Sequence, residues 1–294
     1  MKNNDLKLPS YGGQALIEGV LMRGKRFLAA AFREPDGSIQ IVSEELSGIY
    51  TSSITKLPFL RGLVILWDAL GLGMKYITIS ANVQTGEDEK IDGPAMVFTI
   101  LFSFVVAIGL FFLLPTGIAA IVQKFSGISA FLTNLFEGVI RLIFIILYIW
   151  LVGKNKEIKR VFSYHGAEHK TINAFEAGAN LVPEEVSTYP LFHPRCGTGF
   201  ILILVIFSII LFTIIGPIPN LLIRLLSRII LIPLLVMVAY EYMRFASNYV
   251  SHPYLKMLSI PGMLLQRLTT NEPSREILEV SIAAFKTMYK LENE

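Results

Sequence analysis

Apolar residues along this chain are concentrated in long uninterrupted runs. Residues 95–123 and 197–223 contain no charged side chain. Each run exceeds the roughly 20 apolar residues that an α-helix needs to cross a hydrocarbon core about 30 Å thick. Two shorter uncharged runs, 142–153 and 229–240, reach that length only if a charged residue is included. We therefore predict four transmembrane helices, near residues 96–121, 131–152, 199–218 and 223–243.

Residues 10–50 follow a different pattern, which predicts β structure. Residues 27–33 and 38–44 flank a turn, residues 34–37, in which Pro35 fixes φ and Gly37 tolerates a positive φ. The glycine-punctuated residues 11–24 predict a pair of strands with close backbone approach. They do not form a phosphate-binding loop, because the Gly-Lys-Ser/Thr ending is absent.

Two further segments predict surface helices rather than spans. Residues 58–81 are mostly apolar, but Arg61, Asp68 and Lys75 recur every seven residues and share one face. We predict an amphipathic helix on the inner membrane surface or packed on the bundle, either interfacial or re-entrant. The second helix follows Ser274, a predicted N-cap, and has one apolar stripe formed by Ile277, Val280, Ala284, Met288 and Leu291.

Composition and charge extend this pattern to a topology. The chain is 53% hydrophobic and 17% charged, whereas a soluble domain has charge on about a quarter of its residues. Lys and Arg number ten before the first span, six in 153–198 and six after residue 243, and such segments stay in the cytoplasm. We predict an α-helical polytopic plasma-membrane protein with about four transmembrane helices, a small β-containing N-terminal segment and both termini in the cytoplasm.

The predicted organisation has five parts. A cytoplasmic segment (1–93) ends in an acidic link (86–92), and a cytoplasmic loop (154–198) separates two helix pairs (94–153 and 199–243). Cytoplasmic helices (244–294) complete the chain. The first 90 residues show no apolar segment with a cleavage site, and a single cysteine excludes an intrachain disulfide and fits a reducing cytoplasm.

The middle loop contains three of the four histidines and the only cysteine. His165 and His169, four residues apart, share one helix face and can bind one metal ion. His193 and Cys196 have the spacing of a metal knuckle, next to Pro194. The four donors predict a tetrahedral Zn²⁺ site, with three alternate ligands: Glu176, Glu241 and His252. The other interpretation is separate structural roles, with histidines capping helix ends and a small buried cysteine.

Residues 165–169 also spell His-x-x-Glu-His, the inverted zinc-protease motif. In such enzymes the two histidines hold Zn²⁺ and the glutamate is the general base, a role that falls on Glu168 here. If His193 and Cys196 also bind the metal, no position remains for water and the site is structural. Glu168 then only orients a histidine.

Charged residues in two spans form a second group: Glu137 and Arg141, and Arg224 and Arg228, each pair about one turn apart. The predicted topology places them toward the outer leaflet, where charges are costly unless paired or able to reach the interface. We interpret them as an interhelical salt-bridge cluster; a transport or lipid-headgroup site is the alternative.

Three motifs resemble the YqhQ family of uncharacterised bacterial membrane proteins, sometimes described as predicted metal-dependent enzymes. They are GGQALIEGVLMRG (12–24), YHGAEHK (164–170) and HPRCGTG (193–199), and the resemblance covers nearly the whole chain. It implies a plasma-membrane location and a metal, without a known reaction.

The leading functional hypothesis is a structural zinc site in a protein that acts through partners, such as membrane-protein biogenesis or transport machinery, or as a homo-oligomer. The basic N-terminal segment is a predicted contact for a protein, anionic lipid or RNA. The second hypothesis is a membrane-associated zinc hydrolase that uses Glu168. Solute transport is the third, supported only by the intramembrane charges.

Overall fold

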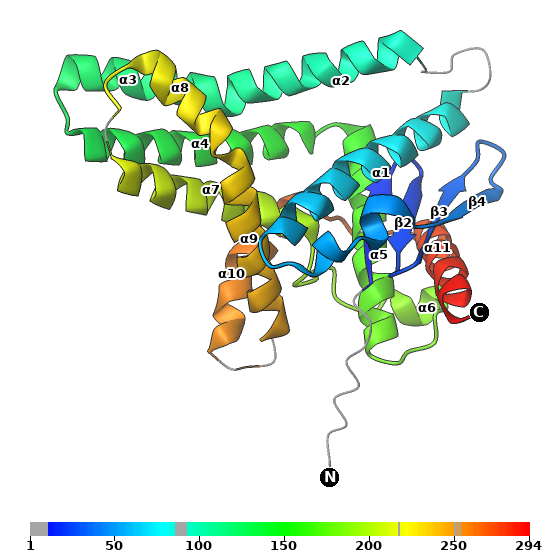
Figure 1. Cartoon of the computed structure of the whole chain (residues 1–294). Helices are drawn as coiled ribbons and strands as arrows, with labels where there is room; N and C mark the ends of the chain where they lie inside the picture. Colours follow the sequence, from blue (N-terminus) through cyan, green and yellow to red (C-terminus); the bar gives the residue numbers. More distant parts are fainter. Residues whose placement is uncertain (1–10, 86–92, 217, 250–251, 253) are drawn as a thin grey trace.

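The computed structural model describes residues 11–85, 93–216, 218–249, 252 and 254–294. The predicted acidic link, 86–92, lies outside them. The chain forms a small sheet covered by helices at one end and a group of long apolar helices that extends away from it (Figure 1). This arrangement agrees with the predicted fold class, α-helical with a β-containing N-terminal segment.

The sheet is antiparallel with strand order β1-β2-β3-β4: Gly12–Leu16, Gly19–Arg23, Phe27–Arg33 and Ile39–Glu45. The predicted hairpin is β3–β4, and its turn is closed by the Ser38 amide donating to Asp36 Oδ1 at 2.8 Å, with Gly37 at φ 91°. The predicted glycine-rich strand pair is β1–β2. Its two-residue turn places Glu18 at φ 51°, a left-handed conformation that is costly for a residue with a side chain.

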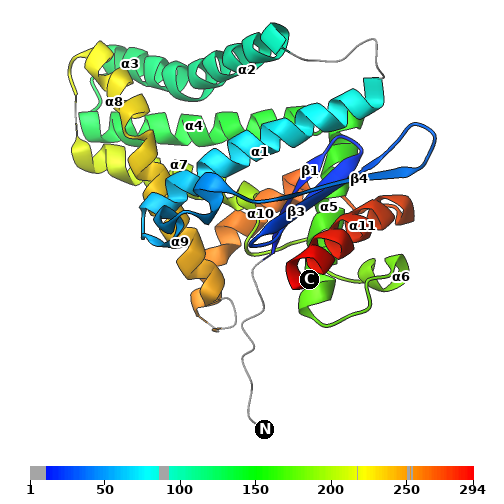
Figure 2. The ribbon, with the colours of Figure 1, turned by 45° about the vertical axis from the view of Figure 1, so that its right-hand side comes forward.

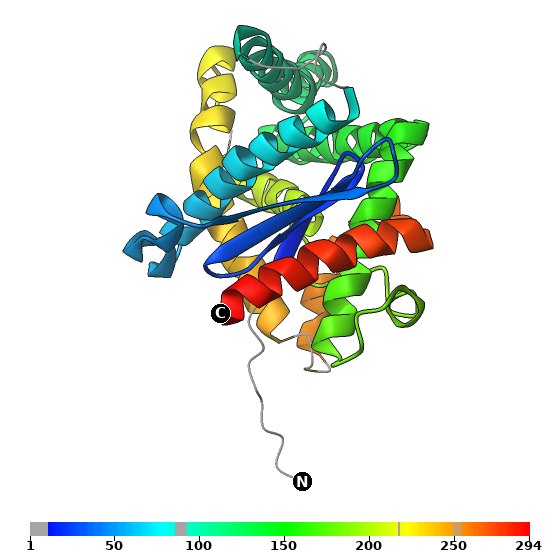
Figure 3. The same cartoon turned by 90° about the vertical axis from the view of Figure 1, so that its right-hand side faces the viewer.

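The central strands β2 and β3 are buried on both faces of the sheet. Side chains alternate along a strand, so Val20 and Met22 point to one core while Leu21 points to the other. The first core is covered by α5 (Lys156–Glu176) and α11 (Arg275–Asn293), and the second by α1 (Leu60–Thr85). Figures 2 and 3 show the sheet between α1 and α11.

The predicted C-terminal helix is α11. The Ile277 amide donates to Ser274 Oγ at 3.5 Å, so Ser274 is the N-cap. Ile277, Val280, Ala284 and Met288 of the predicted stripe are buried against the sheet. This helix therefore completes the core formed by the N-terminal strands.

Three predicted spans are present as long apolar helices side by side (Figure 1). The first is continuous through α2 (Gly93–Ile108), a π-helical turn (Gly109–Leu113) and α3 (Leu114–Ser126). The others are α4 (Ala130–Val152) and α7 (Gly197–Ile215). The most apolar window of the first span has no residue buried inside the protein, so its side chains need an apolar surrounding such as lipid.

The fourth predicted span, 223–243, is not one straight helix. It is divided into α8 (Leu221–Ile230) and α9 (Ile232–Asn248), which meet at an angle of 42°. Pro233 lies in the first turn of α9 and has no amide hydrogen to donate to the preceding turn. The prediction missed this break because it followed hydropathy alone.

The helix predicted over 58–81 is α1, which by length and hydropathy is a fourth straight candidate span. Its later half contributes Leu72 and Tyr76 to the core against the sheet. Its middle is joined to β2 by an ion pair between Asp68 and Arg23, and its start to α9 by an ion pair between Arg61 and Glu241. One face of α1 is therefore packed on the sheet, and its placement as a surface helix rather than a crossing stays a prediction.

Short elements complete the chain. The 3₁₀ turns Gly48–Thr51 and Ser53–Lys56 precede α1, α6 (Pro183–Val186) follows α5, and a 3₁₀ turn (Leu255–Ser259) leads into α10 (Ile260–Thr269). Helix α10 packs on α7 where two glycines meet: a Cβ built on Gly199 would lie 2.9 Å from the Gly262 Cα. This close crossing brings the end of α10 to the His/Cys loop.

Candidate metal centre

Helix α5 carries the first histidine pair. Asn155 caps its start by accepting from the Glu157 amide at 2.7 Å, and residues 164–171 are buried. His165 and His169 lie one turn apart with ring centroids separated by 4.4 Å. The predicted helix with both imidazoles on one face is therefore present.

Both imidazoles are held through the same ring nitrogen. His165 Nδ1 lies 2.8 Å from the Thr269 carbonyl oxygen, and His169 Nδ1 lies 2.6 Å from the Leu191 carbonyl oxygen. A carbonyl oxygen only accepts hydrogen bonds, so each Nδ1 carries a proton, and Nε2 of the neutral ring keeps the lone pair that can bind a metal. Metal-binding histidines are typically oriented in this way.

Cys196 is directed at the same point from α7. It is the N-cap of that helix, and its sulfur lies 3.1 Å from His165 Nε2 and 3.0 Å from Thr198 Oγ1. Thiolate is the form of cysteine that binds metals, so this buried sulfur is a candidate ligand.

These three donors form a compact buried group. One ligand atom each from His165, His169 and Cys196 lie within 4.8 Å of one another. His169 Nε2 is buried without a hydrogen-bond partner among the described residues, which is costly unless a ligand occupies that position. Two imidazole nitrogens and one thiolate fit Zn²⁺.

His193 is adjacent to the group but not part of it. Its ring centroid lies 5.9 Å from that of His169. Gln266 of α10 fixes its backbone by accepting from the His193 amide at 2.9 Å and donating to its carbonyl at 2.8 Å. Its Nε2 is buried, lies 3.6 Å from Glu176 Oε2 and has no hydrogen bond within the described structure.

Glu168 lies next to the three donors and lines a cavity beside them. The cavity has a volume of about 440 Å³ and lies between β1, α5 and the start of α7. Glu168 Oε2 is 3.9 Å from His165 Nε2. Burial raises the pKa of the Glu168 carboxyl, while the charges of His165 and His193 and the Gly13 amide oppose that shift.

Burial also favours the neutral form of two imidazoles. It lowers the pKa of His169, against an opposing effect of Cys196, and that of His193, against an opposing effect of Glu168. Neutral imidazoles are the form that binds metal ions.

With this geometry in place, comparison with known proteins is informative. A family model described as "Protein of unknown function (DUF1385)" matches residues 57–291. The chain belongs to this family. It is 32% identical over 299 residues to the "Uncharacterized protein YqhQ" of Bacillus subtilis (strain 168), a match that covers 97% of this chain and 93% of that relative. No solved structure matches the chain. The resemblance drawn from the three motifs is confirmed, and the metal remains a proposal.

The alternate ligands predicted for this DUF1385 member lie in other contacts. Glu176 forms an ion pair with Arg195. Glu241 pairs with Arg61. His252 is exposed, and its Nδ1 accepts from the Leu255 amide at 3.5 Å. These three residues are outside the compact donor group.

Several residues that position the site were not predicted. The Leu191 and Thr269 carbonyls and the Gln266 side chain carry no sequence signal, because their roles depend on packing between distant elements. Gly13 had a signal. A Cβ at this position would lie 2.8 Å from Glu168 Cγ, which is the close backbone approach predicted for the glycine-rich strands.

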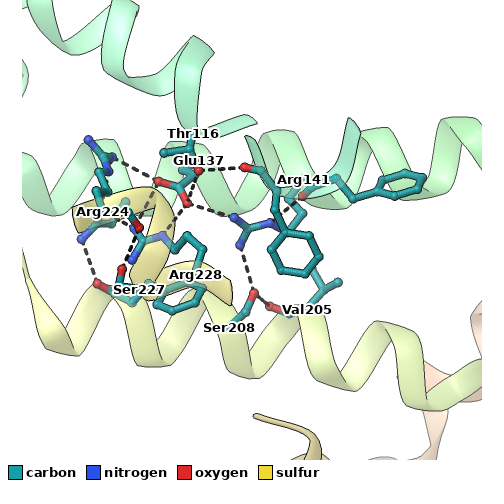
Figure 4. Close-up of polar contacts among 12 residues, drawn as sticks. Thr116, Glu137, Arg141, Val205, Ser208, Arg224, Ser227 and Arg228 are labelled. Atoms are coloured by element: carbon teal, nitrogen blue, oxygen red, sulfur yellow. Dashed lines mark hydrogen bonds and ion pairs between the residues drawn. The ribbon is translucent and has the colours of Figure 1, made fainter. Parts of the chain in front are cut away.

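The predicted intramembrane charges also meet (Figure 4). Glu137 Oε1 accepts from Arg141 at 2.9 Å and from Arg228 Nε at 2.8 Å, and Oε2 accepts from Arg224 at 3.1 Å. All four side chains are buried. The interhelical ion pairs of the leading interpretation are therefore present in the structure.

Proposed function

We propose that this protein is a metal-dependent hydrolase at the inner face of the bacterial plasma membrane, with His165, His169 and Cys196 holding Zn²⁺. The observation that carries the proposal is a three-donor group beside a cavity that contains a buried carboxylate. Catalytic zinc sites have three protein ligands and an open position, whereas structural sites have four. The sequence alone favoured the closed set; the geometry supports the open one.

Each part of the site has a role in this proposal. Zn²⁺ supplies a Lewis acid that polarises the substrate and activates water. Glu168, next to the donor group and facing the cavity, accepts the proton of the attacking water as general base. The Thr269 and Leu191 carbonyls hold the two imidazoles in the tautomer that binds metal.

The cavity lining indicates the kind of substrate. Val161, Phe162 and Ile201 supply apolar surface, and Thr198 and Arg195 supply polar groups. Ile201 belongs to α7, a candidate span, so the cavity lies where that helix leaves the predicted membrane. These features favour an amphiphilic substrate with a hydrolysable ester or amide bond.

A structural zinc site is the second candidate, and His193 is the observation that favours it. Its buried Nε2 lacks a hydrogen bond within the described residues, so a small movement toward His169 would supply a fourth ligand. In that case the centre holds the cytoplasmic segments together, and the protein acts through a partner in membrane-protein biogenesis or transport, or through a second copy of itself.

Metal analysis of the purified full-length protein tests both candidates. We expect one Zn²⁺ per chain, loss of zinc in His169→Ala and Cys196→Ser, and retention in His193→Ala.

A second experiment asks whether the metal has an open coordination position. With Co²⁺ in the site, acetohydroxamate should change the visible absorption, because it binds only to an open position. Zinc loss in His193→Ala together with an unchanged cobalt spectrum would establish the structural site. Absence of stoichiometric metal from the wild type would contradict both.

The Glu168→Gln variant tests whether Glu168 is the general base. We expect this variant to keep its zinc and to hydrolyse p-nitrophenyl esters about 10²–10⁴-fold more slowly, the usual contribution of a general base. Glu157→Gln, an exposed carboxylate on the same helix, is the matched control and should retain activity. Equal rates for Glu168→Gln and the wild type would exclude Glu168 as the base.

A further inference from the structure

The intramembrane cluster contains more positive than negative charge. Arg141, Arg224 and Arg228 share the single carboxylate of Glu137, and all four are buried. No other Asp or Glu occurs in residues 95–153 or 197–240. The three arginines therefore carry two more positive charges than the carboxylate of Glu137 neutralises. Charged side chains buried within membrane-spanning helices are unfavourable unless they are paired.

Arg141 has a hydrogen-bond partner for each of its guanidinium nitrogens, and Arg228 has partners for two of its three, since its Nη1 is buried without one in the described part of the chain. Arg141 donates from Nε to the Phe111 carbonyl at 2.9 Å, within the π-helical turn, and from Nη1 to Ser208 Oγ at 3.3 Å. Arg228 donates to Glu137 and to Asn134 Oδ1 at 3.2 Å, and its guanidinium lies 3.9 Å from the centre of the Phe212 ring. These contacts hold the cluster together.

Arg224 is different. Beyond its bond to Glu137, its contacts to Gln123 Oε1 and Asn134 Oδ1 are both 3.5 Å long, the weak limit of a hydrogen bond. Its Nε is buried and has no partner in the described part of the chain. Arg228 shares that feature at Nη1, but its other contacts, at 2.8–3.2 Å, are shorter than the two 3.5 Å contacts of Arg224. Part of the hydrogen-bonding capacity of Arg224 is thus unused.

Arg224 lines a cavity of about 370 Å³. The same cavity is bordered by Lys124 at the end of α3, by Asn134 near the start of α4, and by Pro219 and Leu221 at the start of α8. These elements meet at the end of the bundle remote from the sheet (Figure 1). The cavity therefore combines two cationic side chains with an apolar wall at a predicted membrane interface.

We infer that this cavity binds a phosphate-bearing anion, held by Arg224 and Lys124, with any attached apolar chain against Leu221. The planar guanidinium matches the geometry of phosphate oxygens. An anion here would neutralise part of the charge that Glu137 leaves uncompensated and would accept hydrogen bonds from the Arg224 guanidinium. The chemistry fits both the headgroup of an anionic phospholipid and a soluble phosphate ester. The inference is independent of the metal centre.

Calorimetric titration of the full-length protein in a neutral detergent tests this site. The probes are dihexanoyl phosphatidylglycerol, dihexanoyl phosphatidylcholine and glycerol 1-phosphate. We expect phosphatidylglycerol to bind more tightly than phosphatidylcholine, and Arg224→Gln to weaken binding about tenfold, as expected for one charge-assisted hydrogen bond. Glycerol 1-phosphate binding as tightly as phosphatidylglycerol would assign the site to a soluble phosphate ester.

Two further variants separate binding from folding. Lys124 is exposed and borders the cavity, so Lys124→Gln should weaken anion binding without disturbing the buried cluster. If Arg224→Gln does not fold, the affinity of Lys124→Gln tests the site instead. Lys154→Gln removes a charge at the other end of α4 and is the matched control, with an expected change below about twofold. No binding by either anionic probe, or equal affinity in all variants, would overturn the inference.

Discussion

Gly13 shows how a single missing side chain shapes the metal centre. It lies in β1 beside Glu168, where an added Cβ would be 2.6 Å from the Leu21 carbonyl oxygen and 2.8 Å from Glu168 Cγ. A backbone oxygen cannot move away as a flexible side chain can, so a larger residue at this position would displace the strand. The neighbouring Gly12 has no heavy atom within 4 Å of such a Cβ.

Gly13→Ala is therefore expected to destabilise the protein by about 1–3 kcal/mol, the usual cost of overpacking a buried position. Gly12→Ala should change stability by less than about 0.5 kcal/mol. Thermal unfolding of the purified protein, followed by tryptophan fluorescence, measures both. If the two variants unfold at the same temperature, the close approach between β1 and α5 does not limit the size of residue 13.

At the scale of elements, α10 helps to set the geometry of the candidate metal centre without contributing a donor to it. Its last turns carry Gln266, which fixes His193, and Thr269, which orients His165. The helix reaches this place because Gly199 and Gly262 let α7 and α10 cross at backbone distance. The crossing thus links a candidate span to the cytoplasmic face.

Gly199→Ala tests that link. The new methyl group would lie 2.9 Å from the Gly262 Cα, so α10 should shift and carry the Thr269 carbonyl away from His165. We expect zinc affinity to fall about 10–100-fold, as for other losses of a group that orients a ligand. Competition with a chelating dye measures the affinity. Gly197→Ala on the same helix, where the added Cβ meets no heavy atom within 4 Å, should retain wild-type affinity.

For the whole molecule, segments far apart in sequence form one unit. The sheet, α5 and α11 come from the three segments predicted to be cytoplasmic: 1–93, 154–198 and 244–294. A shared core requires these segments to lie on the same side of the membrane. The shared core thus places the three segments on one side, and that this side is the cytoplasm stays a prediction.

Cysteine labelling across α4 measures this topology. Ser126→Cys precedes the helix and Glu157→Cys follows it, and both positions are exposed. A membrane-impermeant maleimide should label the first in intact cells and the second only after lysis. The native Cys196 is buried and should give little background. Labelling at position 157 in intact cells would reverse the predicted orientation.

The sequence by itself determined the features that depend on neighbouring residues. Hydropathy over about 20 residues predicted three of the spans, the turn at Asp36 and Gly37 predicted its hairpin, and the spacing of His165 and His169 placed them on one helix face. The apolar stripe of α11 was likewise evident from its period. Each of these follows from local helix or strand geometry, which does not require the rest of the fold.

Only the tertiary structure decided which groups meet and at what distance. It separated His193 from the three-donor group, brought Glu168 to a cavity beneath Gly13, and paired Glu241 with Arg61. It also showed that three arginines share Glu137 and that Arg224 faces a cavity. The physical reason is that metal coordination and ion pairing depend on separations of a few ångströms between elements far apart in the chain, and packing sets those separations.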